Sequence, residues 1–212
     1  MEEAGKVFDA RLKGHNAGFE YLIKRQVERR LCDILDYHRD NMSGITILDC
    51  ETGLTAELQT KHGIIKLKGR ADRVDQRGGI IHILDYKTGI RASVPNWQKF
   101  DMNARQDWPA PLKYTQLPFY VLGYLGGNKG ADVCNMDASL MRLGKENIEE
   151  ETLYKERYKK VPDKSAIFAA YKGAITALIE EILDKDMPFN PPPDETPCAD
   201  CPFKVMCGRH WV

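Results

Sequence analysis

Apolar residues recur at helical spacing in three parts of the chain. In the first 40 residues they predict a long amphipathic helix that begins near Asn16. A second such pattern predicts an amphipathic helix over residues 163–185. The segment 113–125 is apolar and aromatic along most of its length, so a buried helix is expected there. Pro118 would fit in the first turn of that helix or would kink it further in.

Strand patterns follow the first helix and recur once later in the chain. The expected strands cover residues 45–50, 53–59, 63–76, 80–86 and 132–142. Gly53, Gly63 and the pair Gly78-Gly79 indicate tight turns between the first four strands. Such short connections favour an antiparallel meander over a series of βαβ units.

Length, charge and cysteine content narrow the class of protein. The 212 residues suffice for one domain with its own core. The 31 basic residues balance 31 acidic ones, so charge neither indicates nor excludes a nucleic-acid partner. Membrane partners are not expected, because no apolar stretch reaches the roughly 18–20 residues of a membrane span. Three of the six cysteines fall in the last fifteen residues, which favours a metal site in a reducing, cytoplasmic compartment over a disulfide framework.

The candidate chemistry lies at the end of the 80–86 strand. If that strand neighbours the 63–76 strand, Asp72 and Asp85 can meet at one end of the sheet, with Lys87 on the same side as Asp85. Two converging carboxylates repel each other and favour a hard divalent cation such as Mg²⁺. A lysine beside them can orient or deprotonate water and stabilise charge on a phosphodiester. The alternative is a set of surface ion pairs at strand ends.

Three separated motifs occur in order along the chain. They are Gly69-x-x-Asp72-Arg-x-Asp75, Leu-Asp85-Tyr-Lys87-Thr-Gly and Gln116-x-x-x-Tyr120. Together they resemble the RecB-like branch of the PD-(D/E)XK nuclease superfamily, over most of residues 45–210. The resemblance implies an α/β, restriction-endonuclease-like core, in which a mixed sheet with an antiparallel meander is flanked by helices. It also implies hydrolysis of DNA phosphodiesters, with a helicase subunit or a helicase domain of the same chain as partner in recombination or repair.

The resemblance carries catalytic roles onto the first two motifs. The family's two aspartates and its lysine fall on Asp72, Asp85 and Lys87. Asp72 and Asp85 would bind the metal ion, Mg²⁺ or Mn²⁺. The main-chain carbonyl of Tyr86 would be a further metal ligand.

Four other residues, three of them within the motifs, have open roles. Gln116 and Tyr120 lie one helical turn apart, so they share a face and could position the lysine, the metal water or the DNA backbone. A buried glutamine and a core tyrosine are the alternative. Asp75 is expected to be structural, either capping the turn or pairing with Arg73. Glu51 is either an additional acid of the metal site or a turn residue.

The family usually has a metal-ligating histidine upstream of its sheet, commonly after a glycine. His15, which follows Gly14, is the candidate here, although the family's histidine usually lies further upstream. The resemblance therefore favours a chain that is the C-terminal portion of a longer protein. The nuclease domain would cover residues 1–187, and the given chain would begin inside or near that domain. A cysteine-rich tail would cover residues 188–212.

The tail contains cysteines at the spacing of metal ligands. Three thiolates such as those of Cys198, Cys201 and Cys207 would repel or oxidise if brought together without a metal. The pattern resembles the C-terminal part of the iron–sulfur staple of AddB-type nucleases, which implies a 4Fe–4S cluster with a fourth cysteine ligand. Cys32 is one candidate for that ligand. Zinc completed by His210, or no metal at all in this fragment, are the alternatives.

The resemblance, together with the carboxylates and the lysine, implies a Mg²⁺- or Mn²⁺-dependent deoxyribonuclease, with exonuclease action favoured over endonuclease action. DNA phosphates would meet the basic residues at strand ends and the irregular segment 90–112. Trp97 and Trp108 of that segment would stack on bases or anchor the core. The alternatives are a catalytically inactive DNA-binding or scaffolding module of the same fold and a zinc-ribbon-like interaction module.

Overall fold

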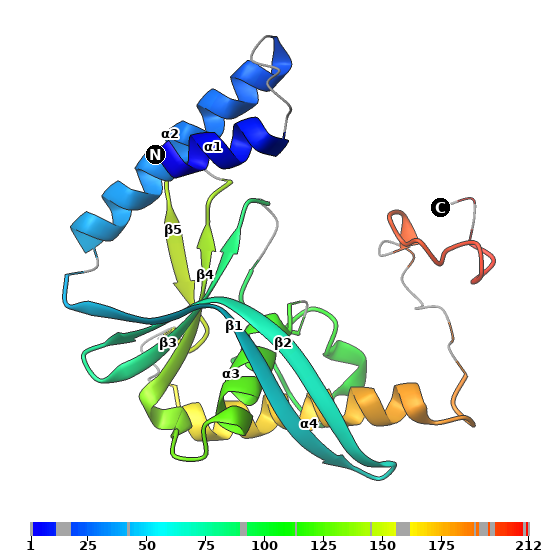
Figure 1. Cartoon of the computed structure of the whole chain (residues 1–212). Coiled ribbons are helices and arrows are strands. Elements are labelled where there is room, and N and C mark those ends of the chain that lie inside the picture. The colour runs from blue at the N-terminus through cyan, green and yellow to red at the C-terminus, as the bar shows by residue number, and fades with distance from the viewer. Residues whose placement is uncertain are drawn as a thin grey trace.

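A computed structural model of the chain shows a five-stranded sheet with helices packed against it (Figure 1). The residues it describes are 2–11, 18–41, 43–89, 93–112, 114–144, 146–155, 162–188, 190, 195, 198–209 and 211. The helices are α1 (Glu2–Arg11), α2 (Phe19–Asn41), α3 (Gln116–Gly127) and α4 (Lys164–Leu183). The strands are β1 (Ile45–Thr60), β2 (Gly63–Arg77), β3 (Ile80–Lys87), β4 (Met136–Arg142) and β5 (Glu149–Thr152).

The sheet is mixed, with the strand order β1-β2-β3-β4-β5. The first three strands form an antiparallel meander, β3 and β4 run parallel, and β5 pairs antiparallel with β4. A parallel pair needs a long crossover, and α3 lies within the connection between β3 and β4. The predicted α/β class, with a mixed sheet and an antiparallel meander, is therefore confirmed.

β1 is one continuous strand, so the turn predicted at Gly53 is wrong. Gly53 pairs with Arg70 inside the β1–β2 ladder. The irregularities of the strand lie earlier: the register shifts between Ile47 and Asp49, and Glu51 has a left-handed φ of 54°. A single glycine is a weak turn signal where the residues on both sides of it find partners on the same neighbouring strand.

The other two turns predicted between the strands are confirmed. Gly63 opens β2 with φ 106°, directly after the two-residue turn at its N-terminal side. Gly78 (φ 55°) and Gly79 (φ 86°) join β2 to β3. Positive φ is nearly free of steric cost for glycine alone, which is why the chain reverses at these positions.

α3 is the buried helix of the fold, as predicted, and Pro118 lies in its first turn. It packs on β1, β2 and β4, and α4 packs on α3 and β1. The approach of α3 to β1 is close, because a Cβ atom on Gly126 would lie 2.5 Å from the main-chain oxygen of Thr55. This face of the sheet therefore holds the main core.

α2 is the long helix predicted before the sheet, but its apolar face is less buried than the pattern indicated. None of the α2 residues that the structure describes is fully buried, and Leu22 and Leu35 are 63% and 59% exposed. In Figure 1, α1 and α2 project together from one end of the sheet. Contacts of the α2 side chains with the sheet include those of His38, near the C-terminal end of the helix.

Two later elements differ from the prediction. The strand expected from residue 132 begins at Met136, because Val133–Asn135 form a 3-10 turn in which the Asp132 side chain accepts from the N–H of Cys134. β5 was not predicted, since its sequence is three glutamates and a threonine with no apolar signal.

Beyond α4, the described residues 198–209 form turns that lie apart from the sheet in Figure 1. The division of the chain into a nuclease domain over 1–187 and a tail over 188–212 stays a prediction. None of the helices in the described part of the chain combines the length and apolar character needed to cross a membrane.

Candidate active site

The candidate site lies where β2 parts from β3. The ladder between these strands ends at Arg73 and Leu84, whereas β3 stays paired with β4 as far as Lys87. One residue beyond the end of the β2–β3 ladder, Asp72 Oδ2 accepts a hydrogen bond from the main-chain N–H of Tyr86 at 2.6 Å. A carboxylate thereby satisfies a strand donor that the neighbouring backbone leaves unpaired.

Asp85 is buried beside this junction, with 2% of its surface exposed. Its Oδ1 accepts a hydrogen bond from the Tyr120 hydroxyl at 3.3 Å, and its Oδ2 lies 2.6 Å from Lys87 Nζ. Apart from this ion pair, Oδ2 accepts no well-aligned hydrogen bond from any residue that the structure describes. The structure thus brings Asp72, Asp85 and Lys87 together, as the strand spacing predicted.

The charge state of Asp85 depends on its surroundings. Burial raises the pKa of Asp85 above its usual value; Lys87 opposes this shift and the carboxylate of Asp72 adds to it. Without a cation, the second carboxylate and the low polarity of the site both disfavour ionisation of Asp85. A bound cation would reverse that preference.

Gln116 and Tyr120 share a face of α3, as predicted from their spacing. Gln116 Nε2 donates to the Tyr120 hydroxyl oxygen at 2.5 Å, and that hydroxyl donates in turn to Asp85. Burial raises the pKa of Tyr120 to about 12, so its hydroxyl stays protonated at neutral pH and remains a donor. The two side chains therefore hold one oxygen of the Asp85 carboxylate in place.

The donor set fits a hard divalent cation. Asp72 and Asp85 supply two carboxylates. Tyr86, whose main-chain carbonyl is the predicted third oxygen ligand, stands between Asp85 and Lys87 in the sequence. Asp85 Oδ2 is buried, and its ion pair with Lys87 at 2.6 Å shows that a positive charge is favoured at this oxygen. Within the described residues, no three side chains of His, Cys, Asp or Glu gather closely enough to hold a metal by themselves. A set of two carboxylates and a main-chain oxygen stays the prediction for this site.

Two weaker candidates for the metal site are not gathered with these carboxylates. Glu51 lies opposite Asp72 in the β1–β2 register, but its side chain is exposed and pairs with Arg70 at 3.6 Å. It does not form a group of three acids with Asp72 and Asp85 among the described residues. His15 lies outside the described residues, so its role as a ligand stays a prediction.

The cysteines of the tail do not converge on one point. Cys198 is buried, Cys201 partly buried and Cys207 exposed, and no described set of three metal-ligating side chains includes them. Arg209 Nη1 lies 3.4 Å from Cys198 Sγ. α2, which carries Cys32, lies on the other side of the molecule from these turns in Figure 1, and His210 lies outside the described residues.

Trp108 is a core residue, which corrects the idea that it stacks on bases. It is 4% exposed, its Nε1–H donates to the main-chain oxygen of Asp101 at 2.9 Å, and the Arg105 guanidinium lies over its ring. Trp97 is partly buried against the same core, and its Nε1–H donates to the Lys155 main-chain oxygen at 3.3 Å. Both rings anchor the irregular segment to the protein.

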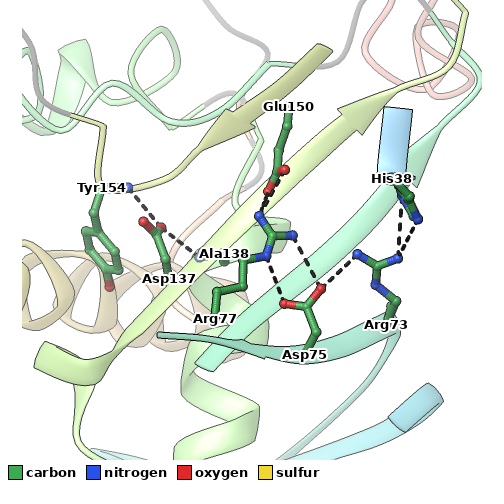
Figure 2. Close-up of polar contacts among 8 residues, drawn as sticks. All are labelled: His38, Arg73, Asp75, Arg77, Asp137, Ala138, Glu150 and Tyr154. Carbon is green, nitrogen blue, oxygen red and sulfur yellow. Dashed lines mark hydrogen bonds and ion pairs between the residues drawn. The ribbon is translucent and has the colours of Figure 1, made fainter. Parts of the chain in front are cut away.

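A buried polar network lies beside the site (Figure 2). Asp75 is fully buried between Arg73, at 2.8 Å, and Arg77, at 3.0 Å, so the predicted pairing of Asp75 with Arg73 is confirmed. Arg77 continues to Glu150 on β5 at 2.8 Å, and Arg73 continues to His38 Nδ1 on α2 at 3.2 Å. Sequence reasoning missed the last two partners. A signal for His38 was present, since it lies four residues after the apolar Ile34.

Comparison with known proteins assigns the chain to a family. Residues 1–208 match the PD-(D/E)XK nuclease superfamily. Comparison with curated proteins gives no significant match. Among solved structures, the crystal structure of SSO0001 is similar with a TM-score of 0.41 and 15% sequence identity, covering 97% of this chain and 81% of that one.

Proposed function

The chain belongs to the PD-(D/E)XK nuclease superfamily, and on this premise we propose that it is a DNA nuclease dependent on Mg²⁺ or Mn²⁺. Its mixed sheet flanked by helices is consistent with the restriction-endonuclease-like fold of that superfamily. The single observation that supports catalysis best is the convergence of Asp72, Asp85 and Lys87 where β2 and β3 part.

Asp72, Asp85 and the main-chain carbonyl of Tyr86 would hold the metal ion. When bound, the ion supplies a Lewis acid for the scissile phosphate and a more acidic water. Lys87 is 30% exposed, so its ammonium can face both the Asp85 carboxylate and a phosphate oxygen at the surface. There it stabilises the negative charge on the phosphoryl oxygens, while the Gln116–Tyr120 pair keeps Asp85 oriented.

Replacement of Asp85 by alanine tests this proposal. The variant is expected to lose Mn²⁺-dependent cleavage of linear double- and single-stranded DNA while keeping most of its DNA binding. Asp36→Ala is a matched control, because Asp36 is an exposed aspartate on α2. If the wild-type protein binds DNA but cleaves neither substrate in Mg²⁺ or Mn²⁺, the chain is an inactive module of the same fold and the proposal fails.

The finer description rests on the three sequence motifs and on the cysteine pattern of the tail. We propose a RecB/AddB-like nuclease of cytoplasmic location that acts as an exonuclease with a helicase in recombination or repair. Circular DNA separates exonuclease from endonuclease action: an exonuclease degrades the linear form and leaves the closed circle intact. Linearisation of the circle would contradict exonuclease action.

A second cofactor is proposed from the spacing of Cys198, Cys201 and Cys207 alone. These thiols would bind a 4Fe–4S cluster, with a further ligand from elsewhere. Iron and sulfide analysis of protein purified without oxygen tests this, with Cys201→Ser as the variant that should lose both elements. Zinc in place of iron would favour the tetrahedral alternative. Absence of metal in the wild type would refute both forms of the proposal.

A further inference from the structure

The ring of Tyr86 is clamped from the side opposite to the catalytic carboxylate. Successive strand residues point to opposite faces, so Tyr86 points away from its neighbours Asp85 and Lys87. The His38 ring stacks on it with centroids 6.4 Å apart and an interplanar angle of 30°. The guanidinium carbon of Arg73 lies 5.9 Å from the centre of the Tyr86 ring, within the range of a cation–π contact.

The clamp formed by Arg73 and His38 is itself held in place. Arg73 is 5% exposed and donates to Asp75 at 2.8 Å, and its other terminal nitrogen lies 3.2 Å from His38 Nδ1. Asp75 in turn accepts from Arg77, which also pairs with Glu150 (Figure 2). A planar guanidinium whose two terminal nitrogens are held in this way has little freedom to move off the ring.

The main chain of Tyr86 links this clamp to the metal-binding groups. Its N–H donates to Asp72 at 2.6 Å, and its carbonyl is the proposed third ligand of the cation. The orientation of both peptide groups depends on the conformation of Tyr86, because they flank its α-carbon. Anything that holds the ring in place also holds these two groups relative to Asp85.

We propose that Arg73, together with His38, is a positioning residue of the nuclease site, acting through the Tyr86 ring to preorganise the main-chain oxygen and the Asp72 carboxylate for the cation. This inference rests on the proposed function. Partners outside the ligand shell that orient metal ligands typically change metal affinity by about 10–100-fold when replaced. Arg73 is argued to act through the Tyr86 ring that it contacts, so it is not assigned a catalytic role.

The affinity for Mn²⁺ in the absence of DNA, measured by titration calorimetry, tests the clamp without relying on activity. Arg73→Lys keeps the positive charge beside Asp75 but loses the planar group over the ring, and it should weaken Mn²⁺ binding about tenfold. Arg77→Lys is the matched control. It alters the same network at the same carboxylate, but the contact to the Tyr86 ring is made by Arg73. It should bind Mn²⁺ like the wild type.

A Tyr86 variant gives an independent measure, in case a change at buried Arg73 prevents folding. Tyr86→Leu loses the ring and should bind Mn²⁺ about tenfold more weakly than the wild type. Unchanged Mn²⁺ affinity in both Arg73→Lys and Tyr86→Leu would overturn the clamp. So would an equal loss in Arg77→Lys, because it would reveal a general structural effect.

The wild-type protein separates this inference from the function on which it rests. A wild type that neither binds Mn²⁺ nor cleaves DNA removes the proposed function, and the clamp with it. A wild type that binds Mn²⁺ and cleaves DNA, combined with variants of unchanged affinity, removes the clamp alone.

Discussion

Asp72, which adjoins the last paired residue of β2, accepts a hydrogen bond from the main-chain N–H of Tyr86, two residues beyond the last paired residue of β3. The carboxylate therefore stands where the next backbone partner would be. Its Oδ2 accepts the N–H, and its Oδ1 accepts no hydrogen bond from the described residues, which leaves that oxygen available to a cation near Asp85. The separation of β2 from β3 thus leaves a gap, and it places the Asp72 carboxylate in that gap beside Asp85.

Removing the Tyr120 hydroxyl should weaken the site without disturbing the fold. Tyr120→Phe keeps the buried ring but deletes the donor to Asp85 and the acceptor of Gln116. DNA cleavage at a fixed, subsaturating Mn²⁺ concentration is expected to fall by about tenfold. Tyr124→Phe on the same helix is the control and should cleave like the wild type. A Tyr120→Phe variant with full activity would show that this hydroxyl does not orient Asp85.

Asp75 should be essential to stability, because it is a fully buried charge between two arginines. Asp75→Asn leaves those guanidinium groups without their carboxylate, and removing one partner of a buried ion pair costs about 3–5 kcal/mol. Urea unfolding measures the loss. Asp36→Asn breaks only an exposed pair with Arg39 and should cost less than about 1 kcal/mol. Equal, small losses in both variants would mean that the network contributes little.

The close packing of α3 on β1 predicts a contrast between adjacent glycines. A Cβ atom on Gly126 would meet the main chain of Thr55 and Ala56 at 2.5 and 2.7 Å, and backbone cannot give way as a flexible side chain can. Gly126→Ala should reduce the free energy of unfolding by about 1–3 kcal/mol. Gly127→Ala meets no atom within 4 Å and should be neutral or stabilising by less than about 1 kcal/mol. The reverse order in chemical denaturation would contradict the helix position.

The free energy of unfolding of the metal-free protein should fall as the pH is lowered, because His38 becomes protonated. Burial, and then the positive charge of Arg73, lower the pKa of His38 below its usual value of 6.5. Between about pH 6.5 and the lower folded-state pKa, the unfolded chain therefore binds more protons at this residue than the folded protein does. The free energy of unfolding falls as the pH is lowered through that window.

Urea unfolding in EDTA, from about pH 7.5 to about pH 5, measures this effect. His38→Gln removes the titrating group, so its stability should fall less steeply than that of the wild type. The difference between the two profiles isolates His38 from the other titrating groups of the chain. Parallel profiles would show that His38 protonates equally well in the folded and unfolded states.

The amino-acid sequence by itself determined the elements and the chemistry that depend on local pattern. Apolar, strand-like stretches predicted β2 and β3, and the alternation of side chains along a strand placed Asp72, Asp85 and Lys87 near one another. The four-residue interval between Gln116 and Tyr120 placed both on one helix face. These predictions succeeded because strand alternation and helical periodicity are properties of neighbouring residues along the chain.

Only the tertiary structure decided how distant segments meet. It paired Gly53 inside a long strand, buried Trp108 in the core, and brought His38 and Glu150 to the two arginines around Asp75. It also ended the β2–β3 ladder at Arg73 and Leu84, so that the Asp72 side chain accepts the N–H of Tyr86. Each of these outcomes depends on contacts between residues far apart in the sequence, whose energies come from packing and from desolvated charge, and no local period encodes such contacts.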